Sequence, residues 1–178
     1  LMTEQEQKAL EQQALKQIDH DFMQLALEQG QLAYDAGEVP VGAIVVQDGK
    51  VIGRGYNQPI TSLDPSAHAE VVALRDAAKN IGNYRLTGAT LYVTVEPCTM
   101  CTGLLVHSRI DRLVYGATEP KAGVVESAMC LLDSSFFNHK IETRSGVLAE
   151  QASMLMSKFF KMRREGKKKL KQRGAKGS

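Results

Sequence analysis

The segment GATLYVTVEPCTMCTGLLVHSRIDRLVYGA, residues 88–117, predicts a strand, a helix and a second strand in succession. Its first part is rich in β-branched residues and ends at Pro97, its middle part has apolar residues at helical spacing, and its last part again has the pattern of a strand. A helix that connects two strands in this way makes them parallel neighbours in one sheet. The segment therefore predicts an α/β protein.

Two further stretches extend this sheet. VGAIVVQDGKVIGRGYN, residues 41–57, contains two β-rich runs on either side of Asp48-Gly49, a dipeptide that suits the positive φ angles of a tight hairpin. HKIETRSG, residues 139–146, is a candidate fifth strand. We expect a mixed sheet that begins with the antiparallel hairpin and continues in parallel.

Three further helices are expected outside the crossover. The first covers Asp19 to Ala36 and ends at Gly37, with an apolar stripe of Phe22, Leu25, Ala26, Leu32, Ala33 and Ala36. The second begins with Asp64 as N-cap and Pro65 in the first helical position. The third runs from Val147 and places Ala152, Leu155, Met156 and Phe159 on one face.

The composition indicates one cytoplasmic domain. The 178 residues are 43% hydrophobic, which suits a single core. No apolar run approaches the roughly 18 residues of a spanning helix, and the polar start TEQEQKALEQQALKQ is unlike the apolar part of a signal peptide. Three cysteines make a disulfide framework implausible in a reducing compartment, so thiol chemistry or metal binding gains weight.

The charge is divided between an acidic body and a basic C-terminal tail. Residues 158–176 hold ten of the 22 basic residues and one acid, Glu165, so the rest of the chain has 12 basic and 19 acidic residues. A cluster such as KMRREGKKKLKQRGAK can contact phosphates and release counterions, which favours a nucleic-acid partner. The alternative is a frayed terminus that only aids solubility.

Cys98 and Cys101 lie one turn apart at the start of the expected crossover helix, with Pro97 in its first position. The sulfurs can converge there, and the helix N-terminus favours thiolate. A dithiol redox pair and a metal site are both compatible with this spacing. The motif HAE, His68 to Glu70, favours the metal site, because it also begins a helix near the carboxyl end of a strand.

Two thiolates and an imidazole are a typical set of ligands for a catalytic zinc ion, with a fourth position for water. Two thiolates neutralise Zn²⁺, so its water needs a base, and Glu70 is placed to act as one. The alternatives are a core or capping role for His68 and a favourable contact of Glu70 with the helix dipole. The other candidate ligands have no metal-like neighbours: we expect Cys130 to be packing filler and His107 to cap its helix, and we assign no role to His20 and His139.

HAE followed by PCTMC matches the H-x-E and P-C-x-x-C signature of the zinc nucleobase deaminases. The wider sequence resembles the bacterial tRNA-specific adenosine deaminases of the cytidine/deoxycytidylate deaminase superfamily. The resemblance extends from Phe22 to Arg164 and is carried by EVPVGAIVV, GRGYNQPI, DPSAHAEVVALR, NYRL, LYVTVEPCTMC, HSRIDRLVYGA and FFKMRR.

The resemblance implies a three-layer α/β/α cytidine-deaminase-like fold with a five-stranded mixed sheet, a homodimer with one Zn²⁺ per subunit, and conversion of adenosine to inosine at the first anticodon position of a tRNA. His68, Cys98 and Cys101 would hold the metal, Glu70 would carry the proton to N1 of adenine and to the departing ammonia, and Asn57 would contact the nucleoside. Candidate tRNA contacts are Phe160, Arg163, Arg164, Lys121 and Arg112, whereas Phe159 fits the core stripe.

The resemblance also divides the chain into an N-terminal extension (1–18), a zinc-dependent deaminase domain (19–164) and a basic C-terminal tail (165–178). A deaminase of free cytosine, guanine or nucleosides would have the same signature. A zinc module that binds RNA without catalysis is a second alternative, and it predicts a metal with no open position.

Overall fold

Five strands form one mixed sheet in the computed structural model, which describes residues 1–177. The strands are β1 (Gly42–Gln47), β2 (Lys50–Tyr56), β3 (Thr90–Val95), β4 (Arg112–Ala117) and β5 (Glu142–Arg144), and their order across the sheet is β2-β1-β3-β4-β5. β1 pairs antiparallel with β2 and β3, whereas the pairs β3–β4 and β4–β5 are parallel. The predicted mixed sheet is confirmed.

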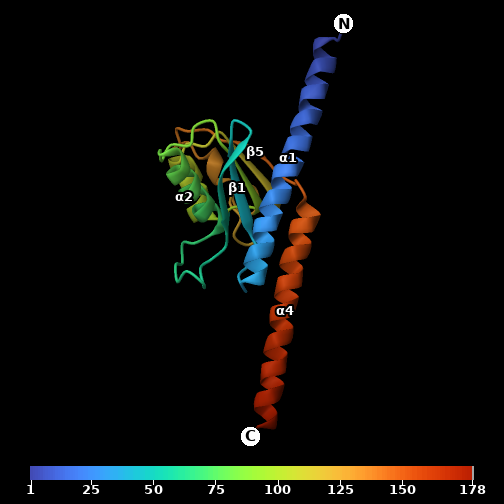
Figure 1. Ribbon diagram of the computed structural model, residues 1–178, viewed down its shortest axis with the longest axis vertical. Helices are drawn as coiled ribbons and strands as arrows, with labels where there is room; N and C mark the ends of the chain where they lie inside the picture. Colours follow the sequence, from blue (N-terminus) through green and yellow to red (C-terminus); the bar gives the residue numbers. More distant parts are fainter. Residues whose placement is uncertain (178) are drawn as a thin grey trace.

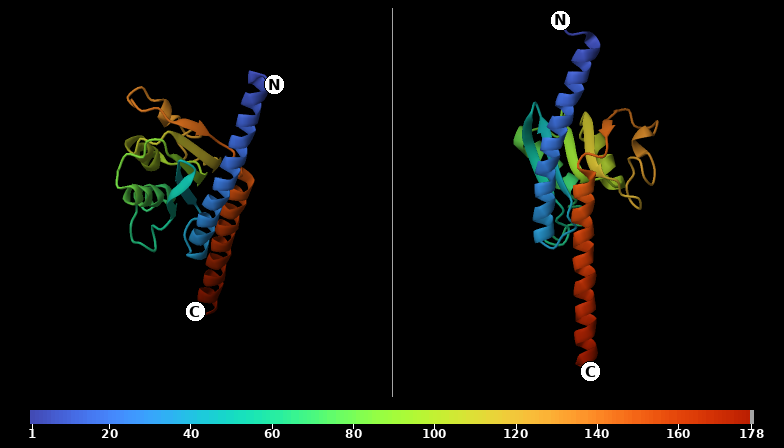
Figure 2. Two further views of the ribbon diagram at one scale, coloured as in Figure 1. Left: turned by 45° about the horizontal axis from the view of Figure 1, so that its top comes forward. Right: turned by 90° about the vertical axis from the view of Figure 1, so that its right-hand side faces the viewer.

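Helices cover both faces of this sheet (Figures 1 and 2). The helices are α1 (Glu4–Asp35), α2 (Ala69–Ile81), α3 (Thr99–His107) and α4 (Ala149–Lys176), with a short 3-10 turn η1 (Leu131–Asp133). α1 and α4 lie side by side on one face, and α2 packs on the other. This arrangement is the predicted three-layer α/β/α fold.

Alternate residues of the central strands belong to two separate hydrophobic cores, one on each face of the sheet. Val45, Leu91 and Val93 pack with residues of α2 and α3, whereas Ile44 and Tyr92 pack with residues of α1. Successive side chains of a strand point to opposite faces, so a sheet that is covered on both sides needs apolar residues at every position. This requirement explains why the sequence of the central strands is a continuous run of apolar and β-branched residues.

The buried face of α1 differs from the prediction. The buried residues of its second half are Asp19, Met23, Ala26, Gly30 and Ala33, whereas Leu32 and Ala36 are exposed. The close approach of β1 selects this face, because a Cβ atom on Gly42 would lie 2.0 Å from the carbonyl oxygen of Ala26 and 2.3 Å from the backbone nitrogen of Gly30. The small residues Ala26 and Gly30 therefore face β1 at this point of close approach.

The two terminal helices extend beyond the sheet in opposite directions (Figure 1). α1 begins in a capping box between Thr3 and Glu6, and all residues up to Ile18 are exposed. α4 continues without a break through the basic tail. We retain the division at residues 18 and 164 as a proposal. Residues up to 18 are exposed and the last buried residue of α4 is Phe159, but both proposed boundaries fall inside helices.

The two helices of the HAE and PCTMC motifs begin later than predicted. α2 starts at Ala69 with His68 as N-cap, and Asp64 instead accepts hydrogen bonds from the backbone nitrogen and hydroxyl of Ser66 in the preceding turn. α3 starts at Thr99 with Cys98 as N-cap, so Pro97 precedes the cap. At the other end of α3, the hydroxyl of Ser108 donates to the carbonyls of Leu104 and Leu105, the capping role expected of His107.

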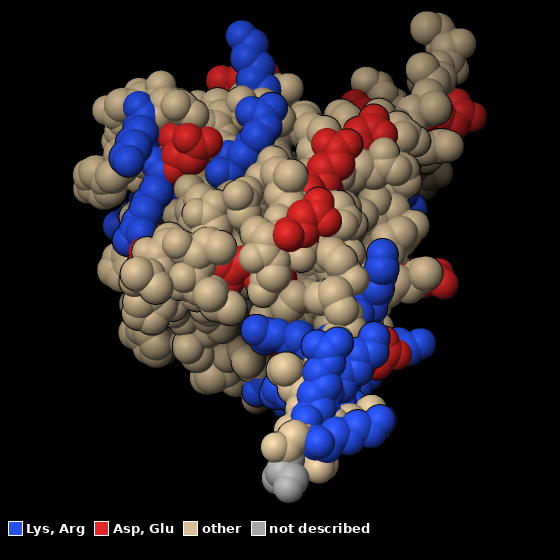
Figure 3. Space-filling model, turned by 60° about the horizontal axis from the view of Figure 1, so that its bottom comes forward, with Lys and Arg blue, Asp and Glu red and all other residues tan. Residues whose placement is uncertain are grey.

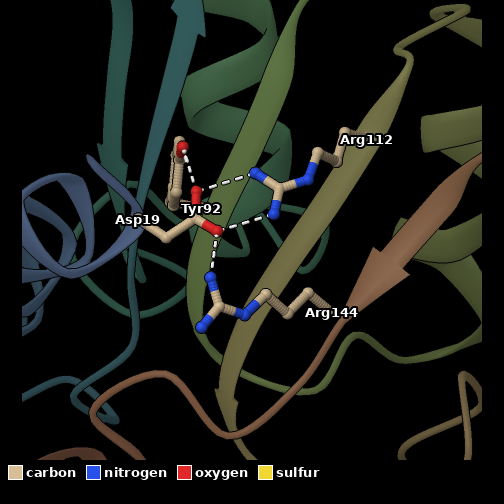
Figure 4. A network of polar contacts seen from close by, with 4 residues as sticks. All are labelled: Asp19, Tyr92, Arg112 and Arg144. Atoms are coloured by element: carbon tan, nitrogen blue, oxygen red, sulfur yellow. Dashed lines mark hydrogen bonds and ion pairs between the residues drawn. The ribbon is translucent and has the colours of Figure 1, made fainter. Parts of the chain in front are cut away.

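A buried ionic network joins α1 to the sheet (Figure 4). Asp19 is 0% exposed and accepts hydrogen bonds from Tyr92 (2.7 Å), from both terminal nitrogens of Arg112 (2.7 and 2.6 Å) and from Arg144 (2.5 Å). Burial alone would raise the pKa of Asp19, but these hydrogen bonds outweigh it and hold the pKa below its ordinary value. Both terminal nitrogens of Arg112 bond to Asp19, and the Arg112 side chain is only 12% exposed. The prediction that Arg112 contacts tRNA is therefore wrong.

Residues 118–141, between β4 and β5, are mostly irregular. Cys130 lies in this segment and is exposed, so the expectation that it fills the core is wrong. Among residues 1–177, no helix is long and apolar enough to cross a membrane.

Candidate metal centre

The predicted ligands His68, Cys98 and Cys101 come together at one edge of the sheet. His68 precedes α2, which follows β2 and a loop, and Cys98 precedes α3, which follows β3. Both residues have extended backbone angles, with φ −71° and ψ 154° at His68 and φ −80° and ψ 179° at Cys98. In both segments the extended backbone therefore ends at the ligand residue, and the helix begins directly after it.

The distances between these atoms suit a tetrahedral zinc ion. Nδ1 of His68 lies 3.6 Å from Sγ of Cys98 and 3.6 Å from Sγ of Cys101, and all three ligand atoms lie within 4.8 Å of one another. Zinc bonds of about 2.3 Å to sulfur and 2.0–2.1 Å to nitrogen, at tetrahedral angles, separate the two ligand atoms by about 3.6 Å. The two nitrogen–sulfur distances thus match those of a zinc site.

The two cysteines have pKa values shifted in opposite directions. The hydrogen bond from Cys101 and the neighbouring His68 lower the pKa of Cys98 to about 3, whereas the hydrogen bond to Cys98 and burial raise the pKa of Cys101. The hydrogen bond to Cys98 also raises the pKa of His68. The Cys101 thiol, and His68 where it is protonated, would each release a proton when the three side chains bind a divalent cation.

Glu70 follows the ligand His68 by two positions and lies in the first turn of α2. It is only 4% exposed, and burial raises the pKa of its carboxyl group, as expected for a group that exchanges a proton during a reaction. Glu70 also contacts the Cys101 thiol. The residue that was predicted to be the base therefore lies beside the ligands.

A cavity of about 160 Å³ opens beside these residues, and its lining includes His68, Glu70, Cys98 and Asn57. The side-chain oxygen of Asn57 accepts a hydrogen bond of 2.8 Å from the backbone nitrogen of Ala69. This bond orients the amide and leaves its NH₂ group as the part that can donate to a bound molecule. The remaining lining residues are Val39, Val41, Val95, Glu96, Glu119 and Met156.

The predicted tRNA contacts lie outside this cavity. Phe159 is 0% exposed, as expected, whereas Phe160 is 40% exposed next to it on α4. Arg163 lies over the Phe159 ring, with its Cζ atom 5.2 Å from the ring centre, and Arg164 is exposed. Lysine and arginine side chains gather over the projecting end of α4 (Figure 3).

Lys121 is also exposed, but it lies in the segment after β4, which includes the cavity residue Glu119. The metal ligands, Glu70 and Asn57 thus form one group. The aromatic and basic candidates of α4 form a second group, and Lys121 lies apart from it in sequence.

Three glutamates near the cavity were not identified as functional residues from the sequence. Glu96 and Glu119 line the cavity, and Glu38 is next to the lining residue Val39. Glu96 and Glu38 are only 4% and 1% exposed. For Glu96 the sequence did contain a signal: an acidic residue at the end of an apolar strand, directly before Pro97. An acidic residue in such a place is buried only if it has hydrogen-bond partners.

Comparison with known families places residues 16–117 in the cytidine and deoxycytidylate deaminase zinc-binding region. A tRNA-specific adenosine deaminase of Haemophilus influenzae is 52% identical over 153 residues, which cover 85% of this chain and 88% of that protein. The enzyme of the same name from Bacillus subtilis is 43% identical over 150 residues, which cover 84% and 93% of the two chains.

A solved structure supports the same relationship. It comes from work on A-to-I editing by tRNA:A34 deaminases at the wobble position of transfer RNA. The two structures superpose with a TM-score of 0.74 at 41% identity, and the match covers 76% of this chain and 98% of the other.

Proposed function

The chain belongs to the cytidine and deoxycytidylate deaminase family, and we propose that it converts adenosine to inosine at the wobble position, the first anticodon position, of a transfer RNA. One observation carries this proposal: the buried Glu70 lies beside a His68, Cys98 and Cys101 cluster in a cavity that is open to a ligand. The named relatives and the matched structure support the choice of tRNA as substrate.

The cluster supplies three ligands to a zinc ion and leaves one tetrahedral position for water. Zinc bound there would act as a Lewis acid and lower the pKa of that water. A fourth protein ligand, which would leave no position for water, would instead favour the alternative of a non-catalytic zinc module. Within residues 1–177, His68, Cys98 and Cys101 are the group of side chains that could hold a metal.

Glu70 moves the protons of the reaction. It takes one from the water whose oxygen attacks C6 of adenine, and it gives a proton to N1 of the ring. It then assists transfer of a proton to the departing ammonia as the C6–N bond breaks. The raised pKa of Glu70 suits both roles, because the carboxyl group must gain and lose a proton near neutral pH.

Asn57 holds the nucleoside. The hydrogen bond from the backbone nitrogen of Ala69 fixes its amide at the cavity wall, and its NH₂ group donates to the base or ribose. An anticodon base suits a cavity of this kind because loop nucleotides are already partly unstacked, so that turning one out of the loop costs less than in a duplex.

The tRNA backbone and neighbouring bases lie against Phe160, Arg163, Arg164 and Lys121. An exposed aromatic ring beside exposed cations offers base stacking and phosphate contacts together. Further lysines and arginines follow Arg164 along α4, and basic side chains gather at the projecting end of this helix (Figure 3). Its positive charge would attract the polyanionic substrate.

The protein acts as a homodimer in the cytoplasm, where tRNA is its substrate. An apolar depression of about 250 Å³, lined by residues of both α2 and α3, supports the dimer, because a partner could cover it. The lining of this depression includes Leu74, Ala78, Leu86, Leu104 and Tyr84. Sedimentation equilibrium should give twice the chain mass of 19.5 kDa, whereas a single-chain mass would contradict the dimer.

Sequencing of tRNA after incubation with the purified protein tests the proposed reaction. We expect inosine at the first anticodon position and at no other adenosine. Rapid turnover of free cytosine, guanine or nucleosides, with no reaction on an anticodon stem-loop, would contradict the proposed substrate and favour a free-base deaminase.

A further inference from the structure

The carboxylate of Glu96 accepts hydrogen bonds from five donors of a single loop. Oε1 accepts from the backbone nitrogen of Glu119 (3.0 Å) and from the hydroxyl of Ser127. Oε2 accepts from the backbone nitrogens of Val125 (3.0 Å), Glu126 (2.8 Å) and Ser127 (3.0 Å). A carboxylate has room for about four such bonds, so Glu96 is fully used by this loop.

The loop, residues 118–127, is wrapped tightly around this carboxylate. A Cβ atom on Gly123 would lie 2.4 Å from Cδ of Glu96, so only glycine allows the approach. The backbone nitrogen of Val124 donates to the carbonyl of Pro97 (3.0 Å), next to the metal ligand Cys98. Glu96 and Glu119 both line the cavity, so the wrapped loop forms one of its walls.

A second buried carboxylate, Glu38, holds the loop between β2 and α2, whose ends Asn57 and His68 line the cavity. Glu38 accepts hydrogen bonds from the backbone nitrogens of Ile60 (3.1 Å) and Thr61 (2.7 Å) and from the hydroxyl of Thr61 (2.8 Å). This loop follows β2 and begins at Asn57, which lines the cavity. Each of the two loops that contribute residues to the cavity lining is therefore held by a buried carboxylate outside that loop.

Loops of this length are usually the mobile parts of a domain. A buried carboxylate that accepts several backbone N–H groups opposes this mobility, because movement of the loop would leave a desolvated charge without partners. The same number of bonds could stabilise any part of the fold. Here the bonds are concentrated on the two loops that border the metal cluster.

We propose that Glu96 and Glu38 are positioning residues, which hold the two cavity walls in the arrangement that accepts the substrate nucleotide. Neither residue takes part in proton transfer. Their effect is on substrate binding, which depends on the walls, and not on the metal, which His68, Cys98 and Cys101 hold. This inference rests on the proposed deaminase function for its kinetic consequence, but the fixing of the loops is independent of the substrate.

The test compares Glu96→Gln with Asp19→Asn in the full-length, zinc-loaded protein. Glutamine presents an NH₂ group to donors that need an acceptor, so the loop loses part of its anchor. Asp19 is an equally buried carboxylate, but it bonds to Tyr92, Arg112 and Arg144 and contacts neither loop. Asp19→Asn therefore controls for a general loss of stability.

Three measurements are made on both variants: zinc content, hydrogen exchange of the amides of residues 119–127, and steady-state inosine formation on an anticodon stem-loop. For Glu96→Gln we expect full zinc content, faster exchange confined to the loop, and a KM raised roughly tenfold or more with kcat nearly unchanged, because binding of ground and transition states is lost equally. For Asp19→Asn we expect no change in KM or in loop exchange.

Loss of zinc from Glu96→Gln would overturn the inference, because Glu96 would then support the ligand Cys98 rather than the loop. Unchanged exchange in the loop, or an equal change of KM in Asp19→Asn, would also overturn it. If Glu96→Gln fails to fold, Gly123→Ala replaces it, since this change displaces the loop and leaves the carboxylate in place. Absence of inosine in the unaltered protein would contradict the proposed function alone, and the exchange measurement would still decide whether Glu96 fixes the loop.

Discussion

His68 and Cys98 each occupy the N-cap of a helix, and 3.6 Å separates Nδ1 of His68 from Sγ of Cys98. The starts of α2 and α3 therefore meet at a single point, although 30 residues separate the two ligands. N-cap residues usually accept a hydrogen bond from the helix with an oxygen atom. Here the two capping positions instead provide a nitrogen and a sulfur that lie close enough to bind one metal ion.

Removal of Glu70 should separate metal binding from catalysis. We expect Glu70→Gln to retain zinc and to lose inosine formation by at least 10²–10⁴-fold, the usual contribution of a general acid–base group. Cys98→Ala and Cys101→Ala should lose both zinc and activity, because each removes one of three ligands. Metal analysis beside an inosine assay distinguishes these results, and loss of zinc from Glu70→Gln would contradict the proposed role of Glu70.

The two adjacent phenylalanines of α4 should respond in opposite ways. Phe159 is 0% exposed and Phe160 is 40% exposed, so Phe159→Ala should lower the free energy of unfolding by about 3–5 kcal/mol and Phe160→Ala by much less. Phe160→Ala should instead weaken stem-loop binding by about 1–3 kcal/mol, the value of one base stacked on an aromatic ring. Urea unfolding and a binding titration measure the two quantities. Unchanged RNA affinity in Phe160→Ala would remove this residue from the proposed interface.

The basic end of α4 should make tRNA binding depend on salt. We expect the double variant Lys167→Gln, Lys168→Gln to bind tRNA more weakly and to reduce the slope of log K against log salt by roughly 0.7 for each lysine that contacts a phosphate. Lys8→Gln, Lys16→Gln is the matched control, because these lysines are exposed on the opposite projecting helix. An equal slope in the two double variants would mean that the basic end only aids solubility.

The Asp19 network should make the protein less stable in acid. The pKa of Asp19 in the folded protein is held below the ordinary aspartate value of 3.8. The ionised carboxylate therefore stabilises the fold fully at pH values above the pKa that Asp19 has in the unfolded chain. This contribution is lost as the pH falls below 3.8 through the lower pKa of the folded protein. We expect Asp19→Asn to lower the free energy of unfolding at pH 7 by about 3–5 kcal/mol, because it breaks a buried ion pair.

Urea unfolding between pH 2 and pH 7 measures both effects. The difference in stability between the unaltered protein and Asp19→Asn should shrink below about pH 4. Asp21→Asn is the control on the same helix, since the Asp21 side chain is 64% exposed and should change stability by less than about 0.5 kcal/mol. A difference that stays constant with pH would contradict the proposed titration of Asp19.

The sequence by itself determined the features that depend on neighbouring residues. The Asp48-Gly49 turn formed as predicted, with φ angles of 51° and 73°, because turn chemistry acts within a few residues. The strand, helix and strand of residues 88–117 also followed from local periodicity. The spacing within HAE and PCTMC identified the residues that form the metal cluster, because each motif lies at a single helix start.

Only the tertiary structure decided the features that depend on distant partners. The buried face of α1 was set by the approach of Gly42, and Arg112 became part of a network with Asp19, 93 residues away. The helices of the two motifs begin at the ligands, and the earlier N-cap candidate Asp64 bonds within a turn. Glu96 and Glu38 find their donors 22 to 31 residues along the chain, in loops with no periodic pattern. A buried charge needs partners wherever the fold brings them, and no local spacing encodes which residues these are.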